Sequence, residues 1–254
     1  MNYFISTLKL RNETLFYFGI ICLLLAIIFI VVSKFSSIEV LGLNAWIKPF
    51  KFAFSTFLYA WAMAWFIGYL PNFNATVFNW IIVVTLGFEI IYITFQAAKG
   101  QLSHFNLTTP AYATLYSLMA IAASIATIAT GYIGVKFFTL NVTHLPTHYL
   151  WSIRLGIFIF VVFAFQGFIM GGRLTHTVGG TDGGDGIAIL NWSKKQGDLR
   201  IAHFIGMHAL QVLPVISYYI LKNTKVTIAL GIGYCVLAVF TLVQALQAKP
   251  FYKF

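Results

Sequence analysis

Residues 197–211 read GDLRIAHFIGMHALQ, and an apolar run continues from them to Leu221. The stretch places an acid, an arginine, two histidines and a glutamine at the entry of that run. In a soluble protein this pattern would predict an ordinary amphipathic helix. In a membrane each of these groups is expensive to bury, so ionisable residues there are functional candidates. The setting of the stretch therefore decides how it is interpreted.

The composition places the whole chain in a membrane. Of the 254 residues, 60% are hydrophobic and only 9% are charged, whereas ordinary globular domains are about 25% charged. Apolar runs of about 20 residues, enough to cross the hydrocarbon core, recur from end to end. We predict an all-α polytopic integral membrane protein, a seven-transmembrane-helix bundle forming one domain over residues 1–254. The predicted spans are 15–32, 52–70, 77–96, 110–133, 150–170, 200–221 and 226–247.

The segments outside the spans are polar. Residues 1–14 form a polar lead, and residues 36–51 are expected to be partly an interfacial helix. The long glycine-rich loop 171–197 matches no phosphate-binding motif, and we expect it to be a flexible flap over a cavity mouth that brings Arg173 or His176 near Arg200.

The formal net charge of +10 does not indicate a nucleic-acid partner. Lys and Arg stand at the ends of the apolar runs, where they anchor helices and meet anionic lipid, so the expected partner is the lipid bilayer. A small anionic or amphipathic ligand is the second expected partner. Cys22 and Cys235 both lie inside apolar runs, which excludes a disulfide framework.

Basic residues also indicate orientation. With seven spans, ten of the 16 Lys and Arg residues lie on the side of the C-terminus and six on the other. The ten are Lys34, Lys48, Lys51, Lys99, Arg173, Lys194, Lys195, Arg200, Lys249 and Lys253. This bias predicts a cytoplasmic C-terminus and an outside N-terminus.

Helical spacing gathers polar residues into three stripes. In the third span Thr85, Glu89, Tyr92 and Gln96 follow each other at steps of four, three and four, which puts them on one helix face. Lys51, Ser55 and Tyr59 do the same in the second span, and Arg200, Phe204, His208 and Gln211 in the sixth. We expect the three stripes to face one cavity near the C-terminal-side membrane surface.

The candidate residues follow from these stripes and their flanking loops. Glu89 and His208 are the predicted catalytic or proton-transferring pair. The predicted ligand-binding residues are Lys48, Lys51, Gln96, Asn106, Arg173, Arg200 and Gln211. The predicted metal ligands are His104, His176, His203 and His208. His203 is five residues before His208 and about 140° around the helix, so the two cannot chelate one ion as a pair. A purely structural interpretation stands beside these, with Glu89 paired to Lys51 or Arg200 and His208 bonding across helices.

Two motifs carry a resemblance. The segment QAAKG at 96–100 with SHFN at 103–106, and GDLRIAHFIGMHALQ preceded by Asn191-Trp192-Ser193, resemble a family of uncharacterised bacterial multi-pass membrane proteins. The likeness extends from Asn44 to Gln211. It implies a bacterial inner-membrane location and carries over no catalytic residue.

Three function classes remain. The first is a haem- or metal-dependent membrane redox enzyme, in which His208 with His104 or His176 ligates haem or a transition metal and Glu89 donates or accepts a proton. The second is a proton-linked transporter or channel that uses Glu89, His208, Lys51 and Arg200. The third is a structural membrane subunit. We take the redox class as the leading hypothesis and leave open whether the protein is an enzyme.

Overall fold

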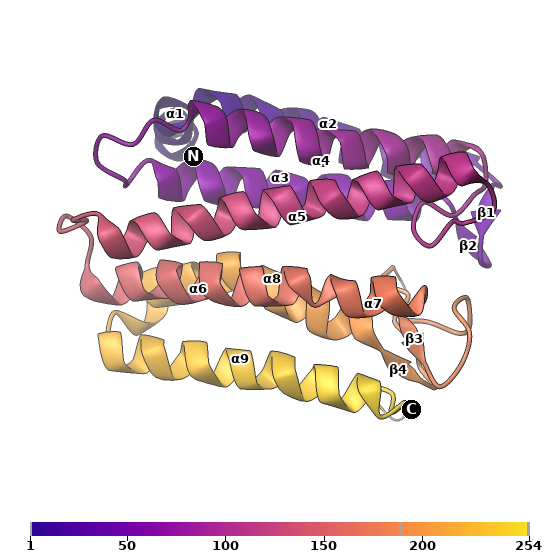
Figure 1. Cartoon of the computed structure of the whole chain (residues 1–254). Helices are drawn as coiled ribbons and strands as arrows, with labels where there is room; N and C mark the ends of the chain where they lie inside the picture. The colour runs from indigo at the N-terminus through magenta and orange to yellow at the C-terminus, as the bar shows by residue number, and fades with distance from the viewer. Residues whose placement is uncertain (1, 188, 253–254) are drawn as a thin grey trace. The chain divides into compact units, whose positions relative to one another are not determined.

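The chain is an all-α polytopic membrane protein, as the sequence predicts. The computed structural model describes residues 2–187 and 189–252. Within them, seven helical segments are long and apolar enough to cross a membrane. Figure 1 shows them in chain order, and their bounds are α2 Glu13–Phe35, α3 Ile47–Ile67, α4 Thr76–Ala98, α5 Pro110–Thr139, α6 Thr147–Phe165 continued by α7 Gly167–Arg173, α8 Leu199–Ile216 continued by a π-helix at Ser217–Leu221, and α9 Thr224–Leu246.

Side-chain caps explain where several spans begin. Asn12, Thr109 and Asn223 each accept a hydrogen bond from a backbone N–H in the first turn of α2, α5 and α9. Asp198 caps α8 in the same way. Short polar side chains are favoured at this position because the first N–H groups of a helix have no partner inside the helix. The caps therefore fix the first residue of each of these four helices.

The structure adds two elements outside the predicted spans. The polar lead contains a helix of its own, α1 Asn2–Arg11. The connection 36–51 holds a hairpin of β1 Glu39–Val40 and β2 Leu43–Asn44, and its last residues, from Ile47 on, belong to α3. Its two turn residues, Leu41 and Gly42, have φ of 53° and 74°, the left-handed conformation that tight hairpin turns require. Because α3 starts at Ile47, the predicted residues Lys48 and Lys51 lie in its first turns.

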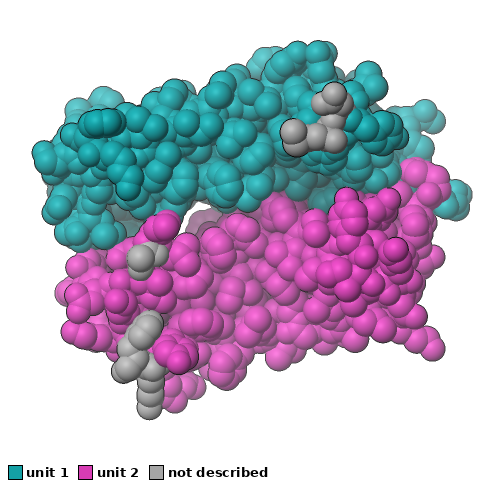
Figure 2. Space-filling model, turned by 180° about the vertical axis from the view of Figure 1, so that it is seen from behind, with its two compact units in different colours: residues 1–143 teal, residues 144–254 magenta. Residues whose placement is uncertain are grey.

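The chain divides into two compact units, residues 1–143 and 144–254, which Figure 2 colours separately. Unit 1 contains α1 to α5 and the hairpin, with α2 packed along α3 and α4 along α5. Unit 2 contains α6 to α9, and α6, α8 and α9 all contact one another. We describe each unit by itself, so the single domain over residues 1–254 stays a prediction.

Buried polar bonds join the helices of unit 1. The amide of Asn12 donates to the side-chain oxygen of Asn79 on α4 over 2.8 Å. The hydroxyls of Tyr59 on α3 and Thr130 on α5 are 2.6 Å apart. Lipid tails are as apolar as leucine, so such bonds and close packing replace the hydrophobic effect between spans.

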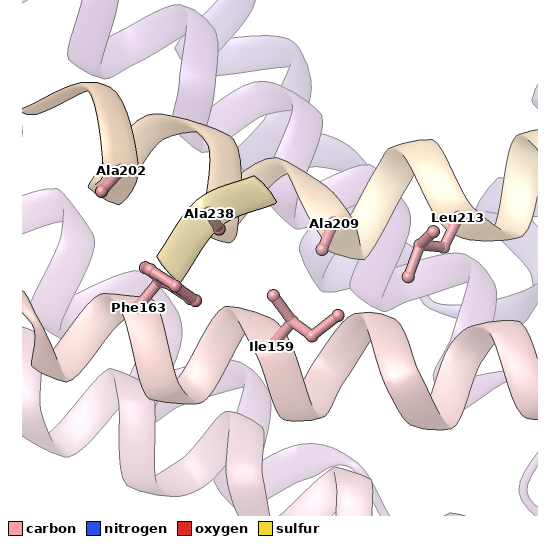
Figure 3. Close-up of a cluster of buried hydrophobic side chains, with 6 residues drawn as sticks. All are labelled: Ile159, Phe163, Ala202, Ala209, Leu213 and Ala238. Atoms are coloured by element: carbon pink, nitrogen blue, oxygen red, sulfur yellow. The ribbon is translucent and has the colours of Figure 1, made fainter. Parts of the chain in front are cut away.

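Small residues bring the helices of unit 2 together. In Figure 3, Ile159 and Phe163 of α6 point toward Ala202, Ala209 and Leu213 of α8. Gly156 lies so close to α8 that a Cβ atom added there would be 2.9 Å from the carbonyl oxygen of Ala209. The contact involves backbone, which cannot rotate away as a side chain can. The α6–α8 interface therefore depends on glycine at this position.

We predict that Gly156→Ala lowers the melting temperature of the purified protein in detergent, because overpacking typically costs about 1–3 kcal/mol. The matched control is Gly233→Ala in α9, where an added Cβ has no neighbour within 4 Å among the described residues. The control should melt at the wild-type temperature or above. Near-UV circular dichroism measures the melting temperature of each variant. Equal melting temperatures for the two variants would contradict this account of the interface.

Candidate functional site

The polar stripe of α4 is buried. Thr85, Glu89, Tyr92 and Gln96 lie on one helix face, and every one of them is less than a tenth exposed. The face continues toward the helix start with Phe78 and Ile82, which are also buried. Helical spacing thus predicts correctly that these four residues share a face of α4, and the structure shows that this face is buried in the protein.

Glu89 stands out within the stripe. Its side chain is 8% exposed, and its Oε1 atom is buried with no hydrogen-bond partner in the part of the chain that the structure describes. No ion pair of Glu89 with another residue of unit 1 occurs among the described residues, so the alternative pairing with Lys51 is not seen there. A pairing with Arg200, which belongs to unit 2, stays a prediction. A buried carboxyl without a partner needs an explanation, because buried polar atoms are nearly always satisfied.

The C-terminal end of α4 carries a polar turn. The amide nitrogen of Gln96 donates to the hydroxyl of Tyr92 and to the carbonyl of Leu102, both over 3.1 Å. Asn106 donates to that same carbonyl over 3.0 Å. Gln96 and Asn106, both predicted ligand-binding residues, thus meet at one backbone oxygen. The Oε1 atom of Gln96 remains buried and unpartnered within the described chain.

His104 lies in the same turn. Its Nδ1 is 3.1 Å from the hydroxyl of Ser103. Its ring lies 5.6 Å from that of Phe52 on α3 and 6.3 Å from that of Tyr116 on α5. The turn is therefore packed among the ends of three helices of unit 1.

Arg200 is bound within its own segment. Its Nε donates to Oδ1 of Asp198 over 2.9 Å and its Nη2 to Oδ2 over 2.6 Å, a fork geometry with a fully buried carboxylate. Nη2 also donates to the carbonyl of Asn191. Asp198 in turn accepts from the backbone N–H groups of Ser193 and Arg200. This geometry gives Arg200 a structural role, which is to hold the end of the glycine-rich loop to the start of α8.

The two histidines of α8 both bind backbone carbonyls through Nδ1. The acceptor of His203 is the carbonyl of Phe163 at 2.7 Å, and that of His208 is the carbonyl of Phe204 at 2.8 Å. A carbonyl only accepts, so Nδ1 carries the proton in each ring, and Nε2 is an acceptor when the ring is neutral. The ring of His208 lies 4.0 Å from that of Phe204.

The predicted metal ligands form no metal-binding cluster among the described residues. Among the residues described by the structure, there is no group of three His, Cys, Asp or Glu side chains that could hold a metal ion. His176, the remaining predicted ligand, pairs its Nδ1 with Oδ1 of Asp182 at 2.9 Å. The metal and haem hypotheses therefore find no supporting arrangement of side chains.

The glycine-rich loop is built into unit 2. Gly171, Gly172 and Arg173 are helical, since α7 runs to Arg173. Beyond them β3 Thr177–Val178 pairs antiparallel with β4 Gly197–Asp198. Gly197 lies against the backbone of Ala245 on α9 so closely that a side chain there would overlap it. Gly197 therefore permits close packing of this end of the loop against α9. A flexible flap formed by the rest of the loop stays a prediction.

Asp182 organises the turn of this loop. It accepts hydrogen bonds from Thr175 Oγ1 at 2.8 Å and from the backbone N–H of Thr177 at 3.0 Å, in addition to its pair with His176. Burial alone would raise the pKa of Asp182, but the hydrogen bonds from His176, Thr177 and Thr175 outweigh burial and hold that pKa well below its usual range. The ionised carboxylate thus stabilises the fold of the loop.

Sequence reasoning missed Gln166. It lies at the break between α6 and α7, is 6% exposed, and neither its amide nitrogen nor its amide oxygen has a partner in the described chain. The signal was a polar residue followed by glycine, Gln166-Gly167, inside a run taken as an uninterrupted span. Unpartnered buried atoms also occur on Glu89, Gln96 and Gln211, all three predicted as site residues.

The predicted pair Glu89 and His208 belongs to different units, with Glu89 in unit 1 and His208 in unit 2. Their shared cavity, and the contact of the third and sixth spans through them, therefore stay predictions. So does the position of the loop over the mouth of that cavity.

We predict that Asp198→Asn destabilises the protein by about 3 kcal/mol, because it strands the charge of Arg200 while keeping an oxygen for the helix cap. Asp185→Asn is the matched control, since its pair with Lys195 is exposed on both sides. The double variant Asp198→Asn/Arg200→Gln should recover part of the loss. Thermal unfolding in detergent measures the stability of all three variants. A double variant that is less stable than Asp198→Asn would contradict the ion-pair account.

We also predict a pH dependence from Asp182. Because its folded pKa is depressed, its contribution to stability is present above the ordinary aspartate pKa of 3.8 and is lost as the pH falls below it. Asp182→Asn should therefore melt below wild type at pH 7, and the difference should shrink below pH 3.8. A gap between the two melting temperatures that is constant with pH would show that the charge of Asp182 does not matter.

Comparison with protein-family models, with curated proteins and with solved structures finds no match to this chain. Function must therefore be argued from the side chains that the spans bury. The clearest candidate among these side chains is the carboxyl group of Glu89, whose Oε1 atom has no partner in the described residues.

Proposed function

We propose that this protein is a proton-linked membrane transporter in which Glu89 takes up and releases the proton. One observation carries the proposal: a carboxyl group lies buried in a spanning helix, and the described residues offer its Oε1 atom neither a cation nor a hydrogen-bond donor. Of the function classes expected from the sequence, this is the one that the geometry favours.

The argument rests on the energy of charge in an apolar setting. An ionised carboxylate buried without a partner is very costly, so the group is neutralised by a proton or compensated by a bound cation. Glu89 can ionise at low cost only when water or a cation reaches it. A cycle that alternately exposes and encloses Glu89 would therefore bind a proton in one state and release it in the other, which is the property a proton-linked carrier needs.

The rest of the α4 face supports a path from Glu89 to the membrane surface. Gln96 is seven residues further along, about 10 Å at the rise of an α-helix, and its Oε1 atom is a second unpartnered acceptor within the described chain. Asn106 and Ser103 are buried beyond it in the polar turn. Polar side chains are therefore available along the helix face between the carboxyl group and the end of the span.

Lys48 and Lys51 belong to the same end of unit 1. They lie in the first turns of α3, next to Phe52, whose ring contacts that of His104 in the polar turn. We propose that this basic end of α3 attracts a small anionic or amphipathic substrate, which moves together with the proton.

We further propose a bacterial inner-membrane location with the N-terminus outside and the C-terminus in the cytoplasm. The orientation rests on the ten-to-six division of Lys and Arg between the two sides. The location rests on the resemblance of the two sequence motifs to bacterial membrane proteins.

Glu89→Gln tests the proposal directly, since it keeps the shape of the side chain and removes the proton. In proteoliposomes with an imposed pH gradient and an internal pH-sensitive dye, the variant should move protons roughly a hundredfold more slowly than wild type. Infrared difference spectra between acid and neutral pH should show a buried carboxyl band in wild type that the variant lacks.

The matched control is Glu39→Gln, which makes the same change at an exposed position of the hairpin. It should keep the wild-type flux and the wild-type band. Melting temperatures of both variants separate loss of function from loss of fold. An unchanged band and unchanged flux in folded Glu89→Gln would refute Glu89 as the protonation site.

A further inference from the structure

Arg11, the last residue of α1, is held rigidly. Its Cζ atom lies 3.9 Å from the ring centroid of Trp65 and 4.0 Å from that of Tyr69. Its Nη1 donates to the carbonyl of Trp65 over 3.0 Å. Its aliphatic stem lies directly on Gly68, where an added Cβ would be 2.6 Å from Cγ of Arg11. Four contacts thus fix one side chain that would otherwise have many rotamers.

The charge of Arg11 has no acidic partner among the described residues. In the part of the chain that the structure describes, no carboxylate forms an ion pair with it. The acid closest in sequence, Glu13, pairs instead with Lys9 at 3.6 Å. A guanidinium is always charged and keeps planar donors even when aromatic rings stack on it. Arg11 therefore presents a fixed positive charge that still has donors for an anion.

Arg11 lines a depression of about 600 Å³. Among the other residues of its wall, Thr7, Asn72 and Asn74 are polar and Leu10 and Phe73 are apolar. Asn74 accepts from the backbone N–H of Thr76 through Oδ1, which directs its amide NH₂ group elsewhere as a donor. The wall therefore combines one cation with hydroxyl and amide groups.

The depression lies where spans end. It is bounded by α1 and by the connection between the last residue of α3, Ile67, and the first of α4, Thr76. These helix ends reach the level of the lipid headgroups when α3 and α4 cross the bilayer. Leu10, beside Arg11, is 87% exposed, which suits contact with lipid.

We propose that this depression binds the phosphate of an anionic phospholipid headgroup. Arg11 would receive the phosphate oxygens through its guanidinium, the geometry that arginine matches best. Thr7, Asn72 and Asn74 would supply further donors, and Leu10 and Phe73 would contact the glycerol and the start of the acyl chains. The proposal goes beyond proton-linked transport and requires nothing of Glu89.

The test is native mass spectrometry of the delipidated full chain in detergent, titrated with phosphatidylglycerol. Arg11→Gln should weaken binding about tenfold or more, which corresponds to about 1.4 kcal/mol. Arg11→Lys, which keeps the charge but not the planar fork, should bind with intermediate affinity. Gly68→Ala should also weaken binding, because it displaces the arginine stem without changing any charge.

Lys9→Gln is the matched control, since it removes one exposed positive charge two residues away. It should bind phosphatidylglycerol like wild type, and a loss equal to that of Arg11→Gln would reduce the effect to general surface charge. Three other results would also overturn the proposal. These are wild-type affinity in Arg11→Gln, equal binding of diacylglycerol, which lacks phosphate, and complete displacement of the lipid by inorganic phosphate. Melting temperatures without lipid confirm that each variant is folded, and the two Arg11 variants keep the test decisive if Gly68→Ala does not fold.

Discussion

Hydrogen bonding without water is the constraint on which this structure depends. Inside a bilayer each backbone N–H and C=O group must find a partner in the protein, which restricts the spans to helices. The same demand acts on side chains. It explains why Asn12 meets Asn79 and why Tyr59 meets Thr130 across unit 1. It also explains why α8 starts directly after Asp198, whose carboxylate binds the helix end, the loop and Arg200 together.

This constraint separates structural polar groups from candidates for function. Arg200 and His203 appear equally unusual in the sequence, yet both have their hydrogen-bond partners within unit 2. Glu89, Gln96 and Gln166 differ, because they keep buried atoms without partners in the described chain. A proton, a substrate or water must complete such groups, and a group that changes its partner during a cycle can couple two processes. That contrast, more than residue type, directs attention to Glu89.

The two proposals for unit 1 use charge in opposite ways. Arg11 is permanently charged, stacked between Trp65 and Tyr69, and placed at the ends of spans where lipid phosphate is abundant. Glu89 is buried within a span, where its charge depends on whether a proton is bound. A fixed cation suits a permanent lipid contact, and a titratable acid suits a transported proton. One unit can therefore hold both an anchor in the membrane and a moving charge.

The sequence by itself determined the class of protein, the number of spans and the face of α4 that carries Glu89. These follow from local rules, namely the length of an apolar run and the 3.6-residue period of the helix. It did not reveal the hairpin at Glu39–Asn44, the helix break at Gln166 or the partner of any buried polar group. Tertiary structure decided those, because the carbonyl of Phe163 reaches His203 only once α6 is folded against α8, and Asn79 reaches Asn12 only once α4 is folded against the start of α2. These partners are far apart in the chain, and no local pattern in the sequence identifies them.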